Sequence, residues 1–135
     1  MGNMTKNFSR EEFTCQCGCA ANNISPTLVD MLQLVRDYIG TGITITSGIR
    51  CAQHNAIVGG VVGSAHVPVD IGAGLYGHGV DIKVSTSQYR YKLTPTLYKA
   101  GFRRIGIGDG FIHVDIDIRK PQDIEFTYYK ANHIA

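Results

Sequence analysis

The chain has 135 residues, enough for one compact domain and too few for two ordinary ones. Its hydrophobic content of 44% and charged content of 18% are typical of a globular protein, and no apolar run approaches the length of about 18 residues that a membrane span needs. The net charge of +2 is too small to make nucleic acid the expected partner.

The N-terminal region carries no apolar segment of the kind an export signal needs, so we expect synthesis in a cytoplasm. A capping box follows, in which Ser9 precedes Glu12 by three residues. Phe8 and Phe13 flank it in the positions of a hydrophobic staple. This pattern predicts a short helix that begins after Ser9.

The four cysteines are unevenly placed: Cys15, Cys17 and Cys19 lie within five residues, and Cys51 comes much later. The C-x-C-x-C run can hold a structural zinc ion, or one of its members can form a disulfide with Cys51. All four thiols can also stay free. The spacing leaves these three interpretations open.

The clearest helix signal is Ser25-Pro26, an N-cap followed by proline at the first helical position. Apolar residues then recur at helical spacing up to Gly40, which predicts a helix over 26–39. The β-branched residues 43–46 indicate a strand that ends at the turn Ser47-Gly48, and residues 51–58 are compatible with a short helix.

The next segment, 63–79, contains five glycines and one proline without a stable period, which predicts a long loop. Long loops inside compact domains are usually functional or mobile. A clean alternation over 80–84 then indicates a strand with Asp81 and Lys83 on one face and apolar residues on the other.

A helix is expected from the capping residues 85–87 to Ala100, kinked or split at Pro95 and ended by Gly101. After the turn Gly108-Asp109-Gly110, a second alternation predicts a strand over 111–118. One face of this strand is polar apart from Phe111 and the other is apolar. The two faces are Phe111, His113, Asp115 and Asp117, and Ile112, Val114, Ile116 and Ile118.

If the two alternating strands are neighbours, Asp81 and His113 share one polar surface. Imidazole and carboxylate groups are ligands that zinc accepts, and His66 in the preceding loop would complete a set of three. Acidic residues on a strand face are usually only solvated, so the spacing by itself also allows a site without metal.

Several motifs, in chain order, resemble those of the M15 peptidases, which are zinc D-Ala-D-Ala carboxypeptidase-like enzymes that include phage endolysins and murein endopeptidases. The matching segments extend from residue 7 to about 119 and are FSREEF with CGC, ITSGIRC with His54-Asn55, VGG, SAH, VDI and FIHVD. The resemblance implies a single α+β domain over 1–135 with the Hedgehog/DD-peptidase fold, in which a small antiparallel sheet carries the site between flanking helices and long loops.

The resemblance also implies that one catalytic Zn²⁺ is held by His66, Asp81 and His113. Fourteen residues separate His66 from Asp81, more than the family pattern H-x-x-G-x-A-x-D allows. Asp81 is preferred because it lies in the strand pattern. Asp70 and His78, within the apparent insertion, remain alternatives.

Many relatives place a glutamate three residues before the last histidine, and Gly110 stands there in this chain. Asp109, one position earlier, is our predicted general base, although Asp-Gly is also an ordinary turn pair. Asp115 is expected to orient a metal ligand.

By the same resemblance Arg50 is expected to bind a substrate carboxylate, the alternative being that it bonds loop carbonyls. Ser64 is expected either to bind substrate or to shape the turn before His66. His54 and Asn55 are expected to cap or pack. The Tyr128-Tyr129 pair can line the cleft or cap the core, and the core is preferred. His133 is expected to be solvated.

The resulting hypothesis is a zinc-dependent peptidase that hydrolyses amide bonds in the stem or cross-link peptides of peptidoglycan. We expect a monomer without membrane insertion, made in a cytoplasm as a phage or prophage endolysin and acting on the bacterial cell wall. One alternative is a catalytically silent zinc-binding module or virion component of the M15 fold. A thiol redox protein built on the cysteines is another.

Overall fold

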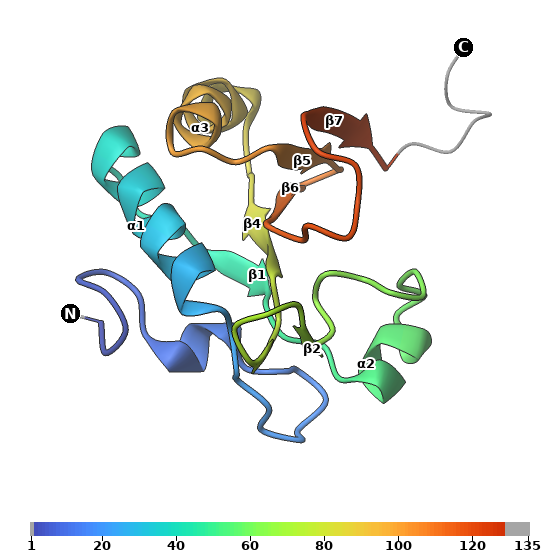
Figure 1. Cartoon of the computed structure of the whole chain (residues 1–135). Coiled ribbons are helices and arrows are strands. Elements are labelled where there is room, and N and C mark those ends of the chain that lie inside the picture. The colour runs from blue at the N-terminus through green and yellow to red at the C-terminus, as the bar shows by residue number, and fades with distance from the viewer. Residues whose placement is uncertain (1, 129–135) are drawn as a thin grey trace, which may run out of the picture.

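A computed structural model of the chain describes residues 2–128. Its centre is a five-stranded sheet in the order β1-β4-β6-β5-β7 (Figure 1). Neighbouring strands are antiparallel except for β5 and β7, which are parallel. The strands are β1 (Ile45–Ser47), β4 (Gly79–Lys83), β5 (Arg104–Ile107), β6 (Phe111–Asp115) and β7 (Ile124–Thr127). The chain is therefore a small α+β protein, as predicted, but the expectation of an antiparallel sheet was wrong at one edge, where β7 pairs parallel with β5.

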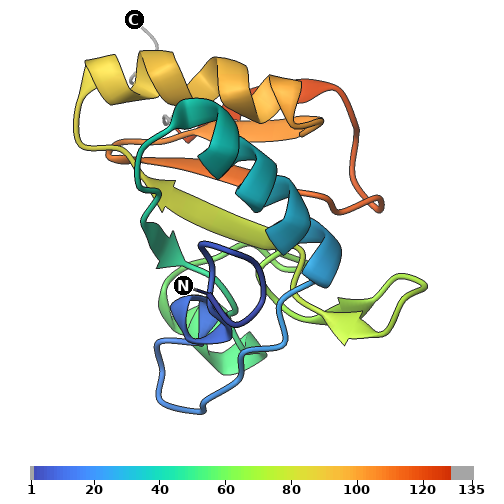
Figure 2. The same cartoon turned by 90° about the vertical axis from the view of Figure 1, so that its left-hand side faces the viewer.

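Two long helices, α1 (Pro26–Ile39) and α3 (Ser87–Lys99), lie across one face of this sheet (Figure 2). The predicted cap of α1 is present, since the Ser25 hydroxyl accepts a hydrogen bond from the Leu28 N–H group at 3.3 Å. Two short helices, η1 (Arg10–Phe13) and α2 (Ala52–Ile57), lie near the lower end of the molecule in Figure 1. None of the described helices is both long and apolar enough to cross a bilayer.

The core lies between the helices and the sheet. From the strands come the fully buried side chains that the alternation placed on the apolar faces, among them Ile82 and Ile112. Leu32 from α1 and Leu97 from α3 pack onto them in one hydrophobic cluster. Because side chains alternate along a strand, this packing turns Asp81 and His113 to the opposite face of the sheet.

Two expectations about elements were wrong, and the structure excludes one alternative of a third. The predicted long loop contains a small antiparallel hairpin of β2 (Val69–Asp70) and β3 (Leu75–Tyr76). Of the kink or split expected at Pro95, the structure excludes the split: helix α3 continues through the proline, because Leu93 and Leu97 on either side are fully buried and hold both halves in the core. Strand β6 ends at Asp115, and Ile118 is 68% exposed instead of buried.

Candidate active site

The polar face of the sheet carries one continuous row of residues across all five strands. Pairing in the sheet places Ser47 of β1 beside Asp81 of β4, and Asp81 beside His113 of β6. The row continues through Gly106 of β5 to Phe126 of β7. The antiparallel register of β4 and β6 therefore brings together two residues that are far apart in sequence.

His66 reaches the same point from the loop between α2 and β2. Its Nε2 atom lies 3.2 Å from Asp81 Oδ1, and Nδ1 of His113 lies 3.0 Å from the same oxygen. All three side chains are nearly buried, and one ligand atom from each lies within 4.8 Å of the other two. The structure thus brings together the three residues predicted to hold the metal.

The outer nitrogens of both imidazoles face acceptors. Nδ1 of His66 lies 2.7 Å from the Gly48 carbonyl oxygen, and Nε2 of His113 lies 2.7 Å from Asp115 Oδ2. Because a carbonyl and a carboxylate accept hydrogen bonds, each outer nitrogen can keep a proton, and the inner nitrogen offers a lone pair to a metal ion once its own proton, which it shares with Asp81 in the metal-free protein, is released. Two imidazole nitrogens and a carboxylate oxygen that face one another share protons in the metal-free protein and can release them to a metal ion, so the donor set fits such an ion.

Asp115 is itself held in place. Its Oδ1 atom accepts hydrogen bonds from Nε of Arg104 at 2.8 Å and from the backbone N–H of Asp117 at 3.0 Å. Arg104, on β5, is nearly buried, and its Nη1 also donates to the Pro121 carbonyl at 2.6 Å. A chain of contacts therefore runs from Arg104 through Asp115 to His113, in agreement with the orienting role expected of Asp115.

The charges of the cluster shift its pKa values in opposite directions. Burial raises the pKa of Asp81, but hydrogen bonds with His113 and His66 outweigh it and hold this pKa well below its usual range. Burial also raises the pKa of Asp115, but the hydrogen bond to His113 and the positive charge of Arg104 outweigh burial and lower this pKa. Burial lowers the pKa of His113, but its hydrogen bonds to Asp115 and Asp81 prevail and raise it.

Arg50 lies beside the cluster and contacts three side chains. Its Nη2 is 3.4 Å from Asp81 Oδ2, its Nη1 donates to Asn55 Oδ1 at 3.2 Å, and its Nε donates to Ser47 Oγ at 3.3 Å. These side-chain contacts replace the loop carbonyls that one interpretation anticipated. The guanidinium is thereby held at the cavity wall.

These residues surround a cavity of about 390 Å³. Its lining includes the predicted residues Arg50, Ser64, His66, Asp81, His113 and Asp115. Ser64 is buried, and its hydroxyl accepts a hydrogen bond from the His66 N–H at 3.2 Å, a contact that favours the turn-shaping role.

Tyr128 also lines the cavity and is 49% exposed, so the expectation that it lies in the core was wrong. The centroid of its ring lies 5.0 Å from that of Phe111 on β6 and 5.6 Å from that of Phe126 on β7. Tyr128 directly follows β7 in the chain. Burial and the charges of Asp81 and Asp115 raise the pKa of its hydroxyl. Tyr129 and His133 lie outside the described residues.

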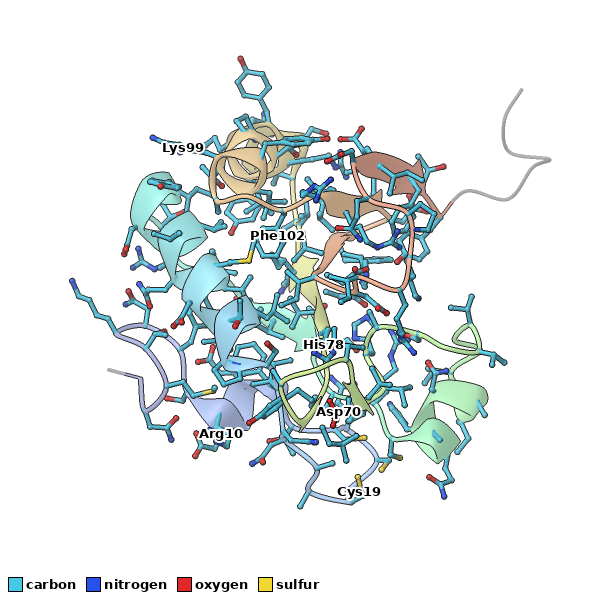
Figure 3. All side chains as sticks on the ribbon, viewed as in Figure 1. Arg10, Cys19, Asp70, His78, Lys99 and Phe102 are labelled. Carbon is cyan, nitrogen blue, oxygen red and sulfur yellow. The ribbon has the colours of Figure 1, made fainter. Side chains whose placement is uncertain are left out.

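Other predicted site residues lie elsewhere. Asp109 is exposed in the turn between β5 and β6 and is not part of the cavity wall, so its position gives no support to the predicted role as general base. Asp70 is exposed on the β2–β3 hairpin, where its carboxylate accepts a hydrogen bond from the Gly72 N–H at 2.9 Å. His78 lies between the hairpin and β4 (Figure 3). Neither alternative joins the cluster that His66 and His113 form with Asp81.

Sequence reasoning missed Arg104 and Phe126, because neither β5 nor β7 was predicted. One signal was present: Ile105 and Ile107 alternate with Arg104 and Gly106, which is the pattern of a half-buried strand. Nothing local indicated that Arg104 would pair with Asp115.

Comparison with known families supports the interpretation of the His66, Asp81 and His113 cluster as the metal site of a peptidase. The family model described as Peptidase M15 matches residues 6–115, a range that contains every candidate metal ligand and Asp115. No curated protein matches the chain. Because the matching range covers most of the sequence, the chain belongs to the peptidase M15 family, whose members are metal-dependent peptidases.

Proposed function

We propose that this peptidase uses zinc to hydrolyse amide bonds in the stem or cross-link peptides of peptidoglycan. The observation that carries the proposal is the convergence of His66, Asp81 and His113 in one cavity. Two imidazoles and one carboxylate are a common ligand set of catalytic zinc, which keeps a fourth position open. When bound, the ion would polarise a peptide carbonyl and increase the acidity of water.

The chain's own residues bind and orient the substrate. Arg50 and Lys120 bring positive charge to the cavity wall, and a guanidinium pairs well with a carboxylate. Peptidoglycan stem peptides are rich in carboxylates, which makes them a suitable substrate class. The Tyr128 hydroxyl is protonated at neutral pH, as for any tyrosine whose pKa is not lowered, so it can donate a hydrogen bond to the oxygen on which charge develops.

We further propose that the protein acts on the bacterial cell wall in the manner of an endolysin. Its isoelectric point of about 8.4 gives it a mildly positive charge, which favours association with an anionic wall.

The test is mass spectrometry of the soluble fragments that the protein releases from purified peptidoglycan, with and without a chelator and after zinc is added back. We expect release that stops with the chelator and resumes with zinc, and the fragment masses identify the bond. The matched variants are His113→Ala, expected to be inactive, and His54→Ala, which removes an imidazole that belongs to neither group of candidate metal ligands.

A second candidate is the catalytically silent module. It is favoured by Gly110 at the position of the family glutamate and by the exposed position of Asp109, which leave the general base unassigned. Zinc bound at the cluster without release of fragments from several wall types would support this candidate over a peptidase.

A further inference from the structure

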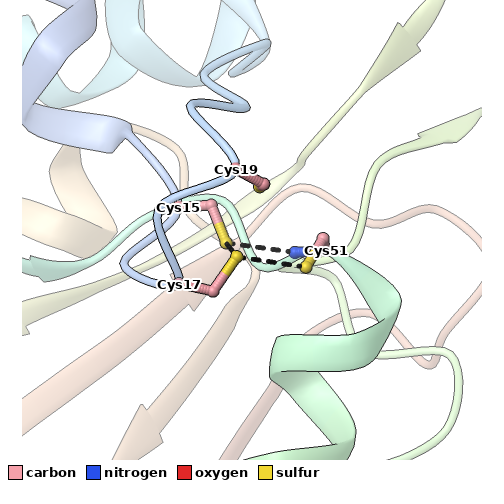
Figure 4. Close-up of side chains that lie close together, drawn as sticks. All are labelled: Cys15, Cys17, Cys19 and Cys51. Atoms are coloured by element: carbon pink, nitrogen blue, oxygen red, sulfur yellow. Dashed lines mark hydrogen bonds between the residues drawn. The ribbon is translucent and has the colours of Figure 1, made fainter.

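A second cluster of metal-type ligands lies away from the cavity wall. Cys15, Cys17 and Cys19 lie in the segment after η1, and Cys51 immediately precedes α2 (Figure 4). Their four sulfur atoms all lie within 4.8 Å of one another. The segment turns at Gly18, whose φ of +92° suits glycine, so three cysteines separated by single residues can face a common point.

The spacing of the sulfurs matches metal coordination. Zinc–sulfur bonds of about 2.3 Å in a tetrahedron place the sulfurs about 3.8 Å apart. Sγ of Cys17 lies 3.5 Å from Sγ of Cys15 and 3.5 Å from Sγ of Cys51. All four cysteines are free thiols in the structure.

Backbone groups donate to these sulfurs. The Cys51 N–H lies 3.4 Å from Sγ of Cys15, and the His54 N–H lies 3.4 Å from Sγ of Cys51. Hydrogen bonds of this kind favour the charged thiolate, which is the form that binds metal.

We propose that Cys15, Cys17, Cys19 and Cys51 form a second, structural metal site that binds zinc through four thiolates. Neither the family match nor the proposed peptidase function requires this site. Binding releases the thiol protons to solvent and changes no oxidation state, so no oxidant is needed. Four cysteine ligands also close the coordination sphere, as expected of a structural ion.

The site would link the N-terminal segment to the cavity. Cys51 follows Arg50, and the chain just before it is already held by two hydrogen bonds. The Ile49 N–H donates to the Phe13 carbonyl at 2.8 Å, and the Arg50 N–H donates to the His66 carbonyl at 3.0 Å. A metal ion on the cysteines would add a third connection to the segment that supplies Arg50.

The experiment separates this site from the histidine cluster. Zinc is quantified in a His66→Ala/His113→Ala double variant, purified under reducing conditions, and then in the same background with Cys17→Ser and Cys19→Ser added. We expect about one zinc ion per chain in the first protein and almost none in the second. The control is Gln16→Ala, which removes the 2.6 Å hydrogen bond from Gln16 to the Thr46 carbonyl but no thiol, and is expected to retain the ion.

A spectroscopic measurement keeps the proposal testable if the cysteine variants fail to fold. Cobalt substituted into the unmodified protein should give intense thiolate-to-metal charge-transfer absorption, and zinc X-ray absorption should show sulfur neighbours at about 2.3 Å. A double variant without zinc would overturn the proposal, as would zinc retained after loss of the cysteines. If the mass of the protein measured without reducing agent were lower than that of the reduced protein by two hydrogens for each disulfide, the cysteines would be assigned to disulfides instead.

Discussion

His113 is held on both sides of its ring, by Asp81 at Nδ1 and by Asp115 at Nε2. Its side chain points to the polar face of the sheet, so it contributes little to the apolar core formed on the other face. His113 therefore contributes more to the metal-binding cluster than to the stability of the fold.

We expect His113→Ala to lose one metal ion per chain and all peptidase activity while it remains folded. Metal analysis, the peptidoglycan assay and circular dichroism check the three parts of this expectation. Full activity in the variant would contradict the site assignment.

Asp115→Asn should weaken metal binding roughly 10- to 100-fold, because an amide holds the His113 tautomer less well than a carboxylate and leaves Arg104 without its anionic partner. Competition with a coloured chelator measures the affinity. Asp109→Ala is the matched control, since it removes an exposed carboxylate from the turn before β6 and should leave the affinity unchanged. A fall in kcat of about 10²- to 10⁴-fold in that control, with metal retained, would restore Asp109 as the base.

Among the elements, β5 and β7 complete the site on the side of β6 that is opposite β4. They bring Arg104 to Asp115 and place the rings of Phe126 and Tyr128 above the polar face. This arrangement requires a residue without a side chain at Gly106, because a Cβ atom there would lie 2.5 Å from the Phe126 ring.

Gly106→Ala should lower the free energy of unfolding by about 1–3 kcal/mol, since the added methyl group overpacks the contact with Phe126. Urea denaturation measures the change. Gly42→Ala provides the comparison, because a Cβ atom at Gly42 meets nothing within 4 Å, and we expect it to stay within about 0.5 kcal/mol of the unmodified protein. Equal stability of the two variants would show that β7 does not pack on Gly106 in solution.

For the whole molecule, the raised pKa of His113 links stability to pH. A histidine whose pKa is higher in the folded state stabilises the protein fully below its unfolded pKa of about 6.5, and this contribution is lost as pH rises through the folded pKa. Asp81 and Asp115 have lowered pKa values and stay charged above pH 6, so they add no slope there.

We therefore expect the metal-free protein to lose thermal stability as the pH rises above about 6.5, relative to metal-free His113→Ala measured in parallel. The comparison cancels the contribution of the cysteines. With metal bound, the sign reverses: affinity rises with pH because protons no longer compete for His113. A metal-free melting temperature that tracks that of the variant at every pH would contradict the expected protonation of His113.

Much of the site follows from local sequence signals. The cap at Ser25 and the alternations over 80–84 and 111–118, of which the second forms a strand only up to Asp115, are visible within a few residues, because a helix repeats every 3.6 residues and a strand every two. The histidines and Asp81 were found by motif. The β2–β3 hairpin and strand β7 were not predicted from the sequence, because they are short and depend on partners distant in sequence.

The sequence by itself thus determined the main helices, three of the sheet strands (β1, β4 and β6) and, through its resemblance to the family, the α+β class and the candidate ligands His66, Asp81 and His113. Tertiary structure alone decided that Asp81 stands opposite His113, that Arg104 supports Asp115, and that Cys51 meets the N-terminal cysteines. The physical reason is that a single chain segment encodes which face a side chain takes, whereas strand register and loop approach depend on packing between segments that lie far apart along the chain.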